Sequence, residues 1–494
     1  MNAVIQKNSG FSVPANSNND SILELAESLS LHWQRLCNRY LPVISSNPMW
    51  RYSRQLTPSD AEQGWKLHVS ATILTAPAVL EAIAPFLESE QACYKAPSSL
   101  SELKRINSGF HYDYSQIGKF ITIYPQTDTQ AIYFAERLHE LTTQFSAPSV
   151  PYDRRFKPES CVYYRYGSFR TNEIKSSGEV AILGIRDLQG NLMPDVRDGE
   201  KPYPDWVSNP FPAPEGKSRA DDSPLKNFRI FRALTQRGKG GTYLGVDINS
   251  AAPCLCLIKE GRKDGEVDWD GRDGYWRVEH EESVIRTLRK AGINVPSIYS
   301  SFKSENSYFL VTEFITGENL HSFLRKKKRR LRVSKATEYA ARLAEIMAQI
   351  HAAGWLWRDC KPGNLIVTKK GDLRPLDFEG ACPIDQPDPV IWSTIMVKSS
   401  ELYENFFVKS AMTADLFALG SVIYLLFEGE LPIVTGDSAP KISRPAVPSE
   451  IKRLVARLID PRTAQFCRAE IVAQKLQNVL KLIKNKTPVI KMAD

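Results

Sequence analysis

The 494 residues predict an α+β fold, in which two domains that each mix strands and helices follow one another along the chain. Three observations support this prediction. The length corresponds to two or three domains of ordinary size. Segments that alternate apolar and polar residues, which is typical of half-buried strands, stand beside segments with helical spacing. A stretch rich in Pro, Gly and Asp, residues 185–224, separates the N-terminal half from the C-terminal half.

By composition the chain divides into a tail rich in Asn and Ser, a first domain, an extended connector and a second domain of two lobes. Polar, low-hydrophobicity tails of this kind are usually disordered. The predicted bounds are 1–19 for the disordered tail, 20–184 for the first domain, 185–224 for the connector and 225–494 for the second domain, with lobes at 225–315 and 316–494.

The overall composition is that of a globular protein, with 42% hydrophobic and 24% charged residues. No apolar run approaches the roughly 18 residues that span a bilayer, and the N-terminus has no signal-peptide core. We therefore expect a cytoplasmic protein with no membrane partner. The net charge of +8 is concentrated in eight Lys and Arg residues within 325–335, a run that usually forms a solvated connection. Docking of an acidic peptide is the alternative, and no nucleic-acid partner is expected because no aromatic residues interleave with the charges. The eight cysteines show no zinc spacing.

The first domain contains a strand with an ionisable face. From Trp65 onward the pattern has period two, with Trp65, Leu67 and Val69 on one side and Lys66 and His68 on the other. A helix entered through Pro77, a strand within 118–125 and a helix within 128–145 follow. Taken alone, Lys66 and His68 are more simply explained as an exposed strand face than as a site.

A second strand, residues 161–169, is rich in tyrosine and contains Arg165. Tyrosine-rich strands are usually packing elements. A guanidinium in the middle of one requires an anion or a carboxylate beside it, because an unpaired charge is costly to bury.

The second domain contains the stretch with the most specific chemistry, residues 354–380. Asp359 is followed two residues later by Lys361 and five residues later by Asn364, on the way into an apolar strand. A hairpin turn at 370–372 then leads to Asp377 within Asp-Phe-Glu.

This spacing resembles that of eukaryotic-like protein kinases. There one Asp orients the acceptor hydroxyl, while an Asn and a second Asp hold Mg²⁺ on the ATP phosphates. The resemblance assigns Asp359 and Lys361 to catalysis and Asn364 and Asp377 to the metal. The cofactors implied are Mg²⁺ and ATP, or another nucleoside triphosphate.

The pattern of a nucleotide site begins upstream. A glycine-rich turn between two strands, which allows backbone N–H groups to approach phosphates, is followed by a strand that ends in Lys259. Glu281 on the next helix is the preferred ion-pair partner of Lys259, with Glu279 and Glu282 as competing choices. The candidate ATP-binding residues are Gly238, Gly240, Gly241, Lys259, Glu281, and, through backbone groups at a hinge, Glu313 and Ile315.

Three helices are expected to complete the second lobe, beginning near 414, 451 and 469, after a long helix at 336–352 that leads into the catalytic stretch. The kinase resemblance implies that Asp415, at the start of the first of these, holds the backbone of the catalytic loop. Two departures stand out, since Trp357 replaces the usual histidine before Arg-Asp and Glu379 replaces the usual glycine after Asp-Phe. Neither change removes a phosphate-transfer group.

Two segments of the first domain, residues 64–70 and 162–169, together resemble the N-terminal half of class III and class IV lanthipeptide synthetases. In that family a phosphoserine/phosphothreonine lyase domain precedes a kinase domain, and a cyclase domain follows. The resemblance implies a phosphothreonine-lyase-like first domain and a bilobal protein-kinase-like second domain. No cyclase segment is expected within this sequence.

The resemblance also assigns roles in the first domain. Lys95 is implied as the base and His68 as the acid of a β-elimination, with Lys66 and Arg165 binding the phosphate. Lys119 and Arg105 are further phosphate-binding candidates. A lysine base must be neutral, and neighbouring cations would depress its pKa.

The implied function is a peptide dehydratase that phosphorylates Ser or Thr of a ribosomal precursor peptide and then eliminates the phosphate. A separate cyclase protein would be a further partner. Two alternatives stay open: a Ser/Thr kinase whose first domain only reads phosphosites, and a kinase-fold scaffold without catalysis. The joint presence of Lys66, His68, Lys95 and Arg165 argues against the first alternative, and the complete kinase set argues against the second.

Overall fold

The computed structural model describes residues 19–45, 47–170, 173–174, 182–195, 202–212, 224–249, 253–304, 306–326, 330–386, 411–433, 440–464 and 467–486. The predicted disordered tail, apart from Asn19, lies outside these ranges. The contacts divide the chain into two compact units. One comprises Met1–Cys254, Ile258–Trp276 and Phe302–Phe309, and the other comprises Leu255–Leu257, Arg277–Ser301 and Leu310–Asp494.

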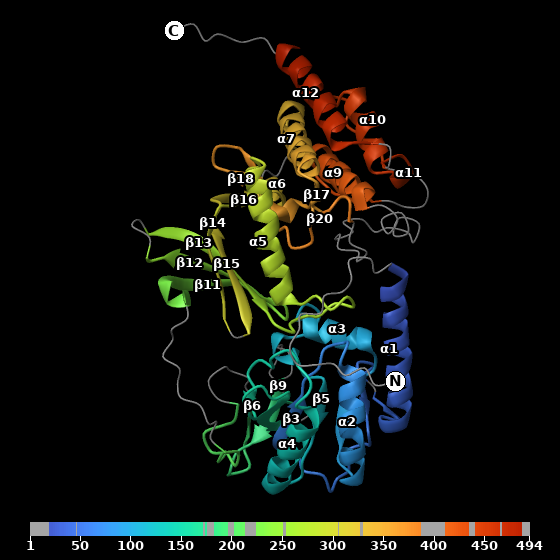
Figure 1. Cartoon of the computed structure of the whole chain (residues 1–494), viewed down its shortest axis with the longest axis vertical. Helices are drawn as coiled ribbons and strands as arrows, with labels where there is room; N and C mark the ends of the chain where they lie inside the picture. Colours follow the sequence, from blue (N-terminus) through green and yellow to red (C-terminus); the bar gives the residue numbers. More distant parts are fainter. Residues whose placement is uncertain are drawn as a thin grey trace. The chain divides into compact units, whose positions relative to one another are not determined.

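A seven-stranded antiparallel sheet organises the first unit, with the strand order β1-β2-β4-β5-β3-β7-β6. Figure 1 labels three of its strands, β3, β5 and β6. Its strands are β1 (Val43–Ile44), β2 (Trp50–Tyr52), β3 (Gln63–Val69), β4 (Tyr94–Pro97), β5 (Ile121–Ile123), β6 (Arg154–Arg155) and β7 (Val162–Ser168). The helices are α1 (Asn19–Tyr40), α2 (Ala76–Ser89), α3 (Leu100–Ser108) and α4 (Asp128–Thr142). Helix α1 packs on α2, and α2 packs on α4, which also contacts β3.

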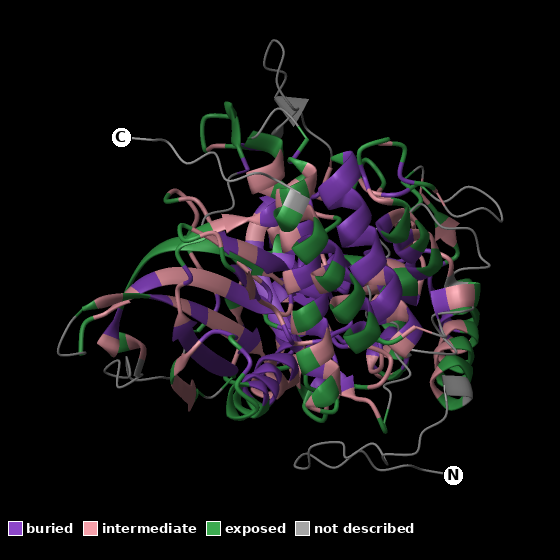
Figure 2. Cartoon of the chain, turned by 90° about the horizontal axis from the view of Figure 1, so that it is seen from above, coloured by how far each residue is buried: buried purple, intermediate pink, exposed green. Residues whose placement is uncertain are grey.

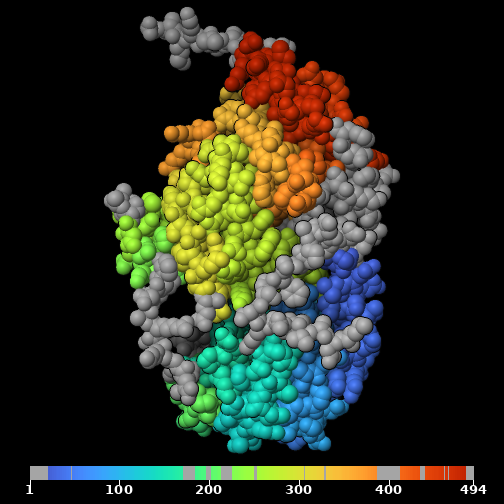
Figure 3. All heavy atoms as spheres, in the orientation of Figure 1, coloured from blue at the N-terminus to red at the C-terminus, as the bar shows by residue number. Residues whose placement is uncertain are grey.

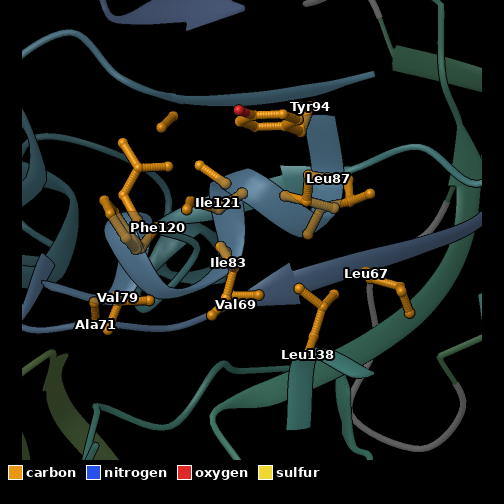
Figure 4. Close-up of a cluster of buried hydrophobic side chains, with 14 of the residues drawn as sticks. Leu67, Val69, Ala71, Val79, Ile83, Leu87, Tyr94, Phe120, Ile121 and Leu138 are labelled. Carbon is orange, nitrogen blue, oxygen red and sulfur yellow. The ribbon is translucent and has the colours of Figure 1, made fainter. Parts of the chain in front are cut away.

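The apolar face of β3 forms the core, as its period-two pattern predicts. Leu67 and Val69 are fully buried. Figure 4 shows them beside Val79, Ile83 and Leu87 of α2 and Leu138 of α4. Pro77 stands in the first turn of α2, where its missing N–H costs nothing. The spheres of α1 to α4, blue to teal in Figure 3, are packed closely. The polar face of β3, with Lys66 and His68, is thus left on the other side of the sheet.

A small antiparallel sheet follows, formed by β8 (Glu173–Ile174), β9 (Ile182–Arg186) and β10 (Leu192–Pro194). Part of the predicted connector is also packed, which corrects the expectation of an extended segment. Phe211 is buried in the core of the first unit and stacks on Tyr164, with ring centroids 3.9 Å apart. Tyr203 packs edge-on against Trp65 at 5.4 Å. Residues 202–212 therefore cover the tyrosine-rich strand.

The glycine-rich segment lies in a five-stranded sheet of order β11-β12-β13-β15-β14. Its strands are β11 (Phe228–Arg237), β12 (Gly240–Asp247), β13 (Cys254–Arg262), β14 (Ile298–Lys303) and β15 (Ser307–Glu313), with helix α5 (Gly274–Lys290) between β13 and β14. Strands β11 and β12 form a hairpin whose two-residue turn is Gly238–Lys239, because Arg237 pairs with Gly240.

Helices dominate the second unit. They are α6 (Leu320–Lys326), α7 (Val333–Ala352), α9 (Ala411–Glu428), α10 (Ser449–Leu458), α11 (Pro461–Ala464) and α12 (Ala469–Lys486), and the short strands are β16 (Gly317–Asn319), β17 (Trp355–Leu356), β18 (Leu365–Thr368), β19 (Leu373–Pro375) and β20 (Cys382–Pro383). Helix α9 is buried along most of its length and packs on α7 and α10. Figure 2 shows buried residues, in purple, on one side of neighbouring helices and exposed residues, in green, on the other. A long helix was predicted at 336–352 and further helices beginning near 414, 451 and 469, and the structure contains all four as α7, α9, α10 and α12.

Candidate active sites

The catalytic loop of the second unit is held by one buried carboxylate. Asp415 on α9 is fully buried, and its oxygens accept the backbone N–H groups of Trp357 at 2.8 Å and Arg358 at 2.6 Å. His351 lies 2.9 Å from the same carboxylate. Arg358 adopts a left-handed φ of 67°, which a non-glycine residue pays for in backbone strain. The two hydrogen bonds to Asp415 offset that strain and fix the residue before Asp359.

Asp359 occupies the loop between β17 and β18 and is 7% exposed. Its carboxylate accepts hydrogen bonds from Lys361 Nζ and from Asn364 Nδ2, both at 2.8 Å. Burial, followed by the nearby negative charge of Asp377, raises the pKa of Asp359 to about 6. The loop thus holds a carboxylate beside one cation, and this carboxylate can accept a hydrogen bond from an incoming hydroxyl.

The residues predicted to bind Mg²⁺ present the right donors. Asn364 donates its Nδ2 to the carboxylate and carbonyl of Asp359, so its side-chain oxygen is the atom left for a cation. The carboxylate of Asp377 is near enough to Asp359 to influence its pKa. One amide oxygen and a nearby carboxylate suit Mg²⁺, which usually takes few protein ligands and completes its shell with phosphate oxygens and water.

Trp357, the departure from the usual histidine, connects the catalytic loop to the Asp-Phe-Glu turn. Its indole N–H donates to the carbonyl of Asp377 at 3.1 Å, and its ring stacks on Phe378 with centroids 5.6 Å apart. Both rings are fully buried. Asp377, a candidate ligand of Mg²⁺, has a left-handed φ of 64°, which strains its backbone. The hydrogen bond from Trp357 helps to hold it in this conformation.

Replacing Trp357 by Phe should keep ring packing but leave the partly buried carbonyl of Asp377 without this donor. We expect a loss of about 1 to 3 kcal/mol in unfolding free energy. Phosphate transfer should also need a higher Mg²⁺ concentration to reach half its maximal rate. Urea unfolding and a Mg²⁺ titration of kinase activity measure both effects. Trp357→His, which removes more volume but keeps a ring N–H, should retain more activity than Trp357→Phe. The reverse order would contradict the role given to the hydrogen bond.

Among the three glutamates on α5, the structure favours Glu281 for the site. Glu281 is 2% exposed, and its Oε1 accepts the backbone N–H of Phe378 at 3.2 Å. The carboxylate of Glu282 is instead bonded to Arg286 and Ser301. Lys259 lies on β13 and is partly buried; its pairing with Glu281 stays a prediction.

The hinge candidates lie at and just beyond the end of β15. The side chain of Glu313 pairs with Arg374 at 3.2 Å, and its backbone N–H donates to Ser297 O at 2.8 Å. Both its carboxylate and its N–H are therefore engaged within the protein, so the backbone contact to adenine predicted for Glu313 would have to use its carbonyl. Ile315, two residues on, is buried, and its role as a backbone contact remains a prediction.

The first unit brings four predicted residues to one face of its sheet. In the strand register, His68 on β3 lies opposite Thr122 on β5, and Thr122 lies opposite Lys95 on β4. Lys66, two residues before His68, lies opposite Arg165 on β7. Because side chains alternate across a strand, all four point to the face away from the core. Strand pairing thus joins residues that the sequence spreads over 100 positions.

His68 belongs to a buried ion network. Its Nδ1 lies 2.5 Å from Asp153 Oδ2, and Lys119 Nζ lies 3.0 Å from Asp153 Oδ1. The side chains of all three are at most 4% exposed. Asp153 had no role in the sequence analysis, because it lies 85 residues from His68 in a loop with no recognisable motif. It is the group that orients the imidazole.

Arg165 has a carboxylate partner, as its position in a tyrosine-rich strand required. Its guanidinium is bonded to Asp195, and both side chains are at most 3% exposed. Asp195 was also missed, because it follows β10 in the segment interpreted as a connector. Lys66, 9% exposed, has its Nζ 6.0 Å from the ring centre of Tyr124.

Lys95 and Arg105 have different surroundings. The ammonium of Lys95 lies 4.2 Å from the ring centre of Trp50, and the side chain is partly buried. Arg105 is on α3 with a side chain that is 49% exposed and paired with Glu102. The structure brings Lys119 into the network of His68, and it leaves Arg105 as a surface ion pair.

Burial lowers the pKa of His68 to about 3, with Lys119 and Lys66 acting in the same direction against the opposing effect of Asp153. The lowered pKa of Asp153 is consistent with an ionised carboxylate beside Lys119 and His68. The charges of the site also favour a neutral imidazole. Three cations, Lys66, Lys119 and Arg165, already outnumber the carboxylates of Asp153 and Asp195. A bound phosphate dianion would reverse this balance and favour protonation.

The depressed pKa makes stability depend on pH. Between pH 6.5 and pH 3 the unfolded chain binds a proton at His68 that the native protein does not, so the unfolding free energy should fall as the pH falls. In His68→Gln this slope should be smaller by up to about 1.4 kcal/mol per pH unit. Urea unfolding across that window measures it, with exposed His321→Gln as the control. Equal slopes for wild type and His68→Gln would show that His68 is not held neutral.

The fold and the site are those of a protein kinase. Asp415 supports the catalytic loop, Asn364 and Asp377 lie beside it, and a helical lobe carries all of them. Residues 238–488, half of the chain, match the family model described as the protein kinase domain. The chain belongs to the protein kinase family. Residues 43–223 match the model described as the RamC N-terminal domain, which covers the sheet that carries His68 and Arg165.

Two similar proteins match different shares of this chain. A probable SapB synthase of Streptomyces coelicolor is 26% identical over 348 residues, covering 67% of this chain and 37% of that protein. Serine/threonine-protein kinase D of Synechocystis is 24% identical over 271 residues, covering 52% of this chain and 53% of that protein. The chain thus spans about a third to a half of the length of these relatives. No helix among the residues described is long and apolar enough to cross a membrane.

Proposed function

We propose that the protein is a peptide dehydratase that phosphorylates Ser or Thr of a ribosomally made precursor peptide and then eliminates the phosphate, as a lanthipeptide synthetase does. The observation that carries this proposal is the row formed by Lys95, Thr122 and His68, flanked by Lys66 and Arg165, on one face of the sheet. It supplies the base, acid and phosphate-binding groups that elimination needs. The likeness to a SapB synthase supports the proposal.

In the first step the kinase lobe transfers phosphate from ATP. Asp359 accepts a hydrogen bond from the Ser or Thr hydroxyl and directs its oxygen at the γ-phosphate. Lys361, 2.8 Å from Asp359, balances the charge that develops on the transferred group. Mg²⁺ held by Asn364 and Asp377 would neutralise the phosphate oxygens when bound.

In the second step the phosphorylated residue loses its α-proton to Lys95. The electron pair of the C–H bond forms the Cα=Cβ double bond, the Cβ–O bond breaks, and protonated His68 donates its proton to the departing phosphate oxygen. Lys66, Arg165 and Lys119 bind the dianion. Adjacent strands are about 4.8 Å apart, so the backbones of His68 and Lys95 are about 10 Å apart, which leaves room for a phosphoamino acid between the two side chains.

Supplying the two halves of the reaction separately tests the proposal. With Mg²⁺, ATP and a Ser/Thr-containing precursor peptide, mass spectrometry should detect a peptide that has lost water. With a synthetic phosphoserine peptide and no ATP, it should detect loss of phosphoric acid. Stable phosphate on both peptides would indicate a kinase with a phosphosite-reading domain, and no change in either would indicate a scaffold.

A further inference from the structure

The glycine-rich turn of the β11–β12 hairpin is buried, although the strand that leads to it is not. Residues 229–236 of β11 are exposed to solvent, whereas Gly238, Gly240 and Gly241 are all buried. A turn whose only task is to cover nucleotide phosphates would be expected to stay open at its tip. Burial confined to the tip indicates that the turn packs against another segment.

That segment is the C-terminal end of α3, which belongs to the same compact unit as the turn. The backbone N–H of Gly238 donates to Ser108 O at 3.0 Å, and Arg237 Nη1 donates to Gly109 O at 2.7 Å. Helix α3 ends at a left-handed Gly109, with φ 62°. The last carbonyls of a helix lack intrahelical donors and carry partial negative charge, so an N–H and a guanidinium are suited to them.

Glycine is required at position 238 by this contact. A Cβ added to Gly238 would lie 1.6 Å from the carbonyl oxygen of Asn107, a backbone atom that cannot move aside cheaply. Gly245 in the same hairpin differs, because its Cβ would lie 3.1 Å from the end of the Ile258 side chain and 3.3 Å from the carbonyl oxygen of Arg229, contacts that shifts of a few tenths of an ångström relieve. The two positions therefore provide a matched pair of tests.

Polar contacts surround the turn on both sides. Lys104 Nζ lies 2.6 Å from Asp268 Oδ1, and Arg262 Nη1 donates to the hydroxyl of Tyr114 at 2.7 Å. The guanidinium of Arg237 also lies 4.8 Å from the ring centre of Phe110. Each contact joins residues 104–114 to the hairpin, to the last residue of β13 or to the segment that follows β13.

We propose that residues 104–114 are a docking surface for the glycine-rich turn, so that a specific interface, and not only the connector, joins the RamC-type domain to the kinase hairpin. Asn107 ties this surface to the lyase candidate site. Its amide donates to Ala71 O at 3.0 Å, and its Oδ1 accepts the N–H of Gly118, the neighbour of Lys119. The interface requires neither of the proposed reactions, so its failure would leave them unaffected.

Cutting the connector of the 494-residue protein tests this interface. A specific protease site placed within 213–223 should yield two fragments that still co-elute in size-exclusion chromatography at micromolar concentration. Gly238→Ala should weaken their association at least about tenfold, because the methyl group separates the surfaces. Gly245→Ala should not. Fragments of the unmutated protein that separate after cleavage, or Gly238→Ala fragments that associate as tightly as wild type, would overturn the proposal.

A charge exchange covers the case in which Gly238→Ala does not fold. Lys104→Asp and Asp268→Lys should each weaken fragment association. The double variant should bind at least about threefold more tightly than the two separate losses in affinity, combined as independent effects, would give. An additive double variant would refute the docking contact.

Discussion

Replacing Asp359 by Asn should reduce phosphate transfer to the peptide by about 100- to 10,000-fold. Asn cannot direct and deprotonate the acceptor hydroxyl, although it is nearly isosteric and can keep hydrogen bonds to its neighbours. The loop itself should remain in place, because the backbone on its N-terminal side is held by Asp415. A radiolabel assay of phosphate incorporation measures the effect, and nucleotide affinity should change little.

Asp372→Asn is the control for this prediction. Asp372 lies in the hairpin between β18 and β19, its side chain is 53% exposed, and it pairs with Arg342 at the surface. Such a surface pair contributes at most about 1 kcal/mol, so phosphate transfer should be unchanged. If Asp359→Asn transferred phosphate at the wild-type rate, the kinase site would have to be elsewhere, and the scaffold or another catalytic arrangement would need to be considered.

Replacing His68 or Lys95 by Ala should stop the protein at a phosphorylated peptide. Each change removes one proton-transfer group, for which a loss of about 100- to 10,000-fold in the elimination rate is expected. The kinase step should continue, so phosphopeptide accumulates where the wild type gives a dehydrated product. Mass spectrometry of the peptide over time follows both species in one reaction.

The control for this pair is His321→Ala, which removes an exposed histidine on α6. Elimination should proceed at the wild-type rate in this variant. The two active-site variants should also fail with a synthetic phosphoserine peptide, which separates a lyase defect from a kinase defect. Dehydration of that peptide at the unmutated rate by both variants would exclude the lyase assignment.

Much of the candidate kinase site could be located from the sequence because its residues are neighbours in the chain. Asp359 and Asn364 lie in one loop, and a short hairpin leads from it to the turn that contains Asp377. The three residues are therefore brought together by local chain geometry. The period-two pattern of β3 likewise determines that Lys66 and His68 share a face, since alternation is a property of the strand itself. These inferences needed no knowledge of which strands pair.

The residues that were missed are partners across long separations. Asp153 and Asp195 lie in loops without a motif, and only the folded chain shows that they approach His68 and Arg165. The packing of Phe211 on Tyr164 was missed for the same reason, since a segment rich in Pro and Asp gives no periodic signal. Arg105 shows the opposite error, because a basic residue near a proposed site need not point into it.

The sequence by itself determined that this is an α+β chain with a kinase catalytic loop, since those features depend on the order of adjacent residues. The tertiary structure decided which charges meet. It places Lys95, His68, Lys66 and Arg165 on one face through strand register, and it sets Asp153 and Asp195 beside them. It also seats the glycine-rich turn on the end of α3, which short-range patterns cannot encode because the two segments are more than 120 residues apart.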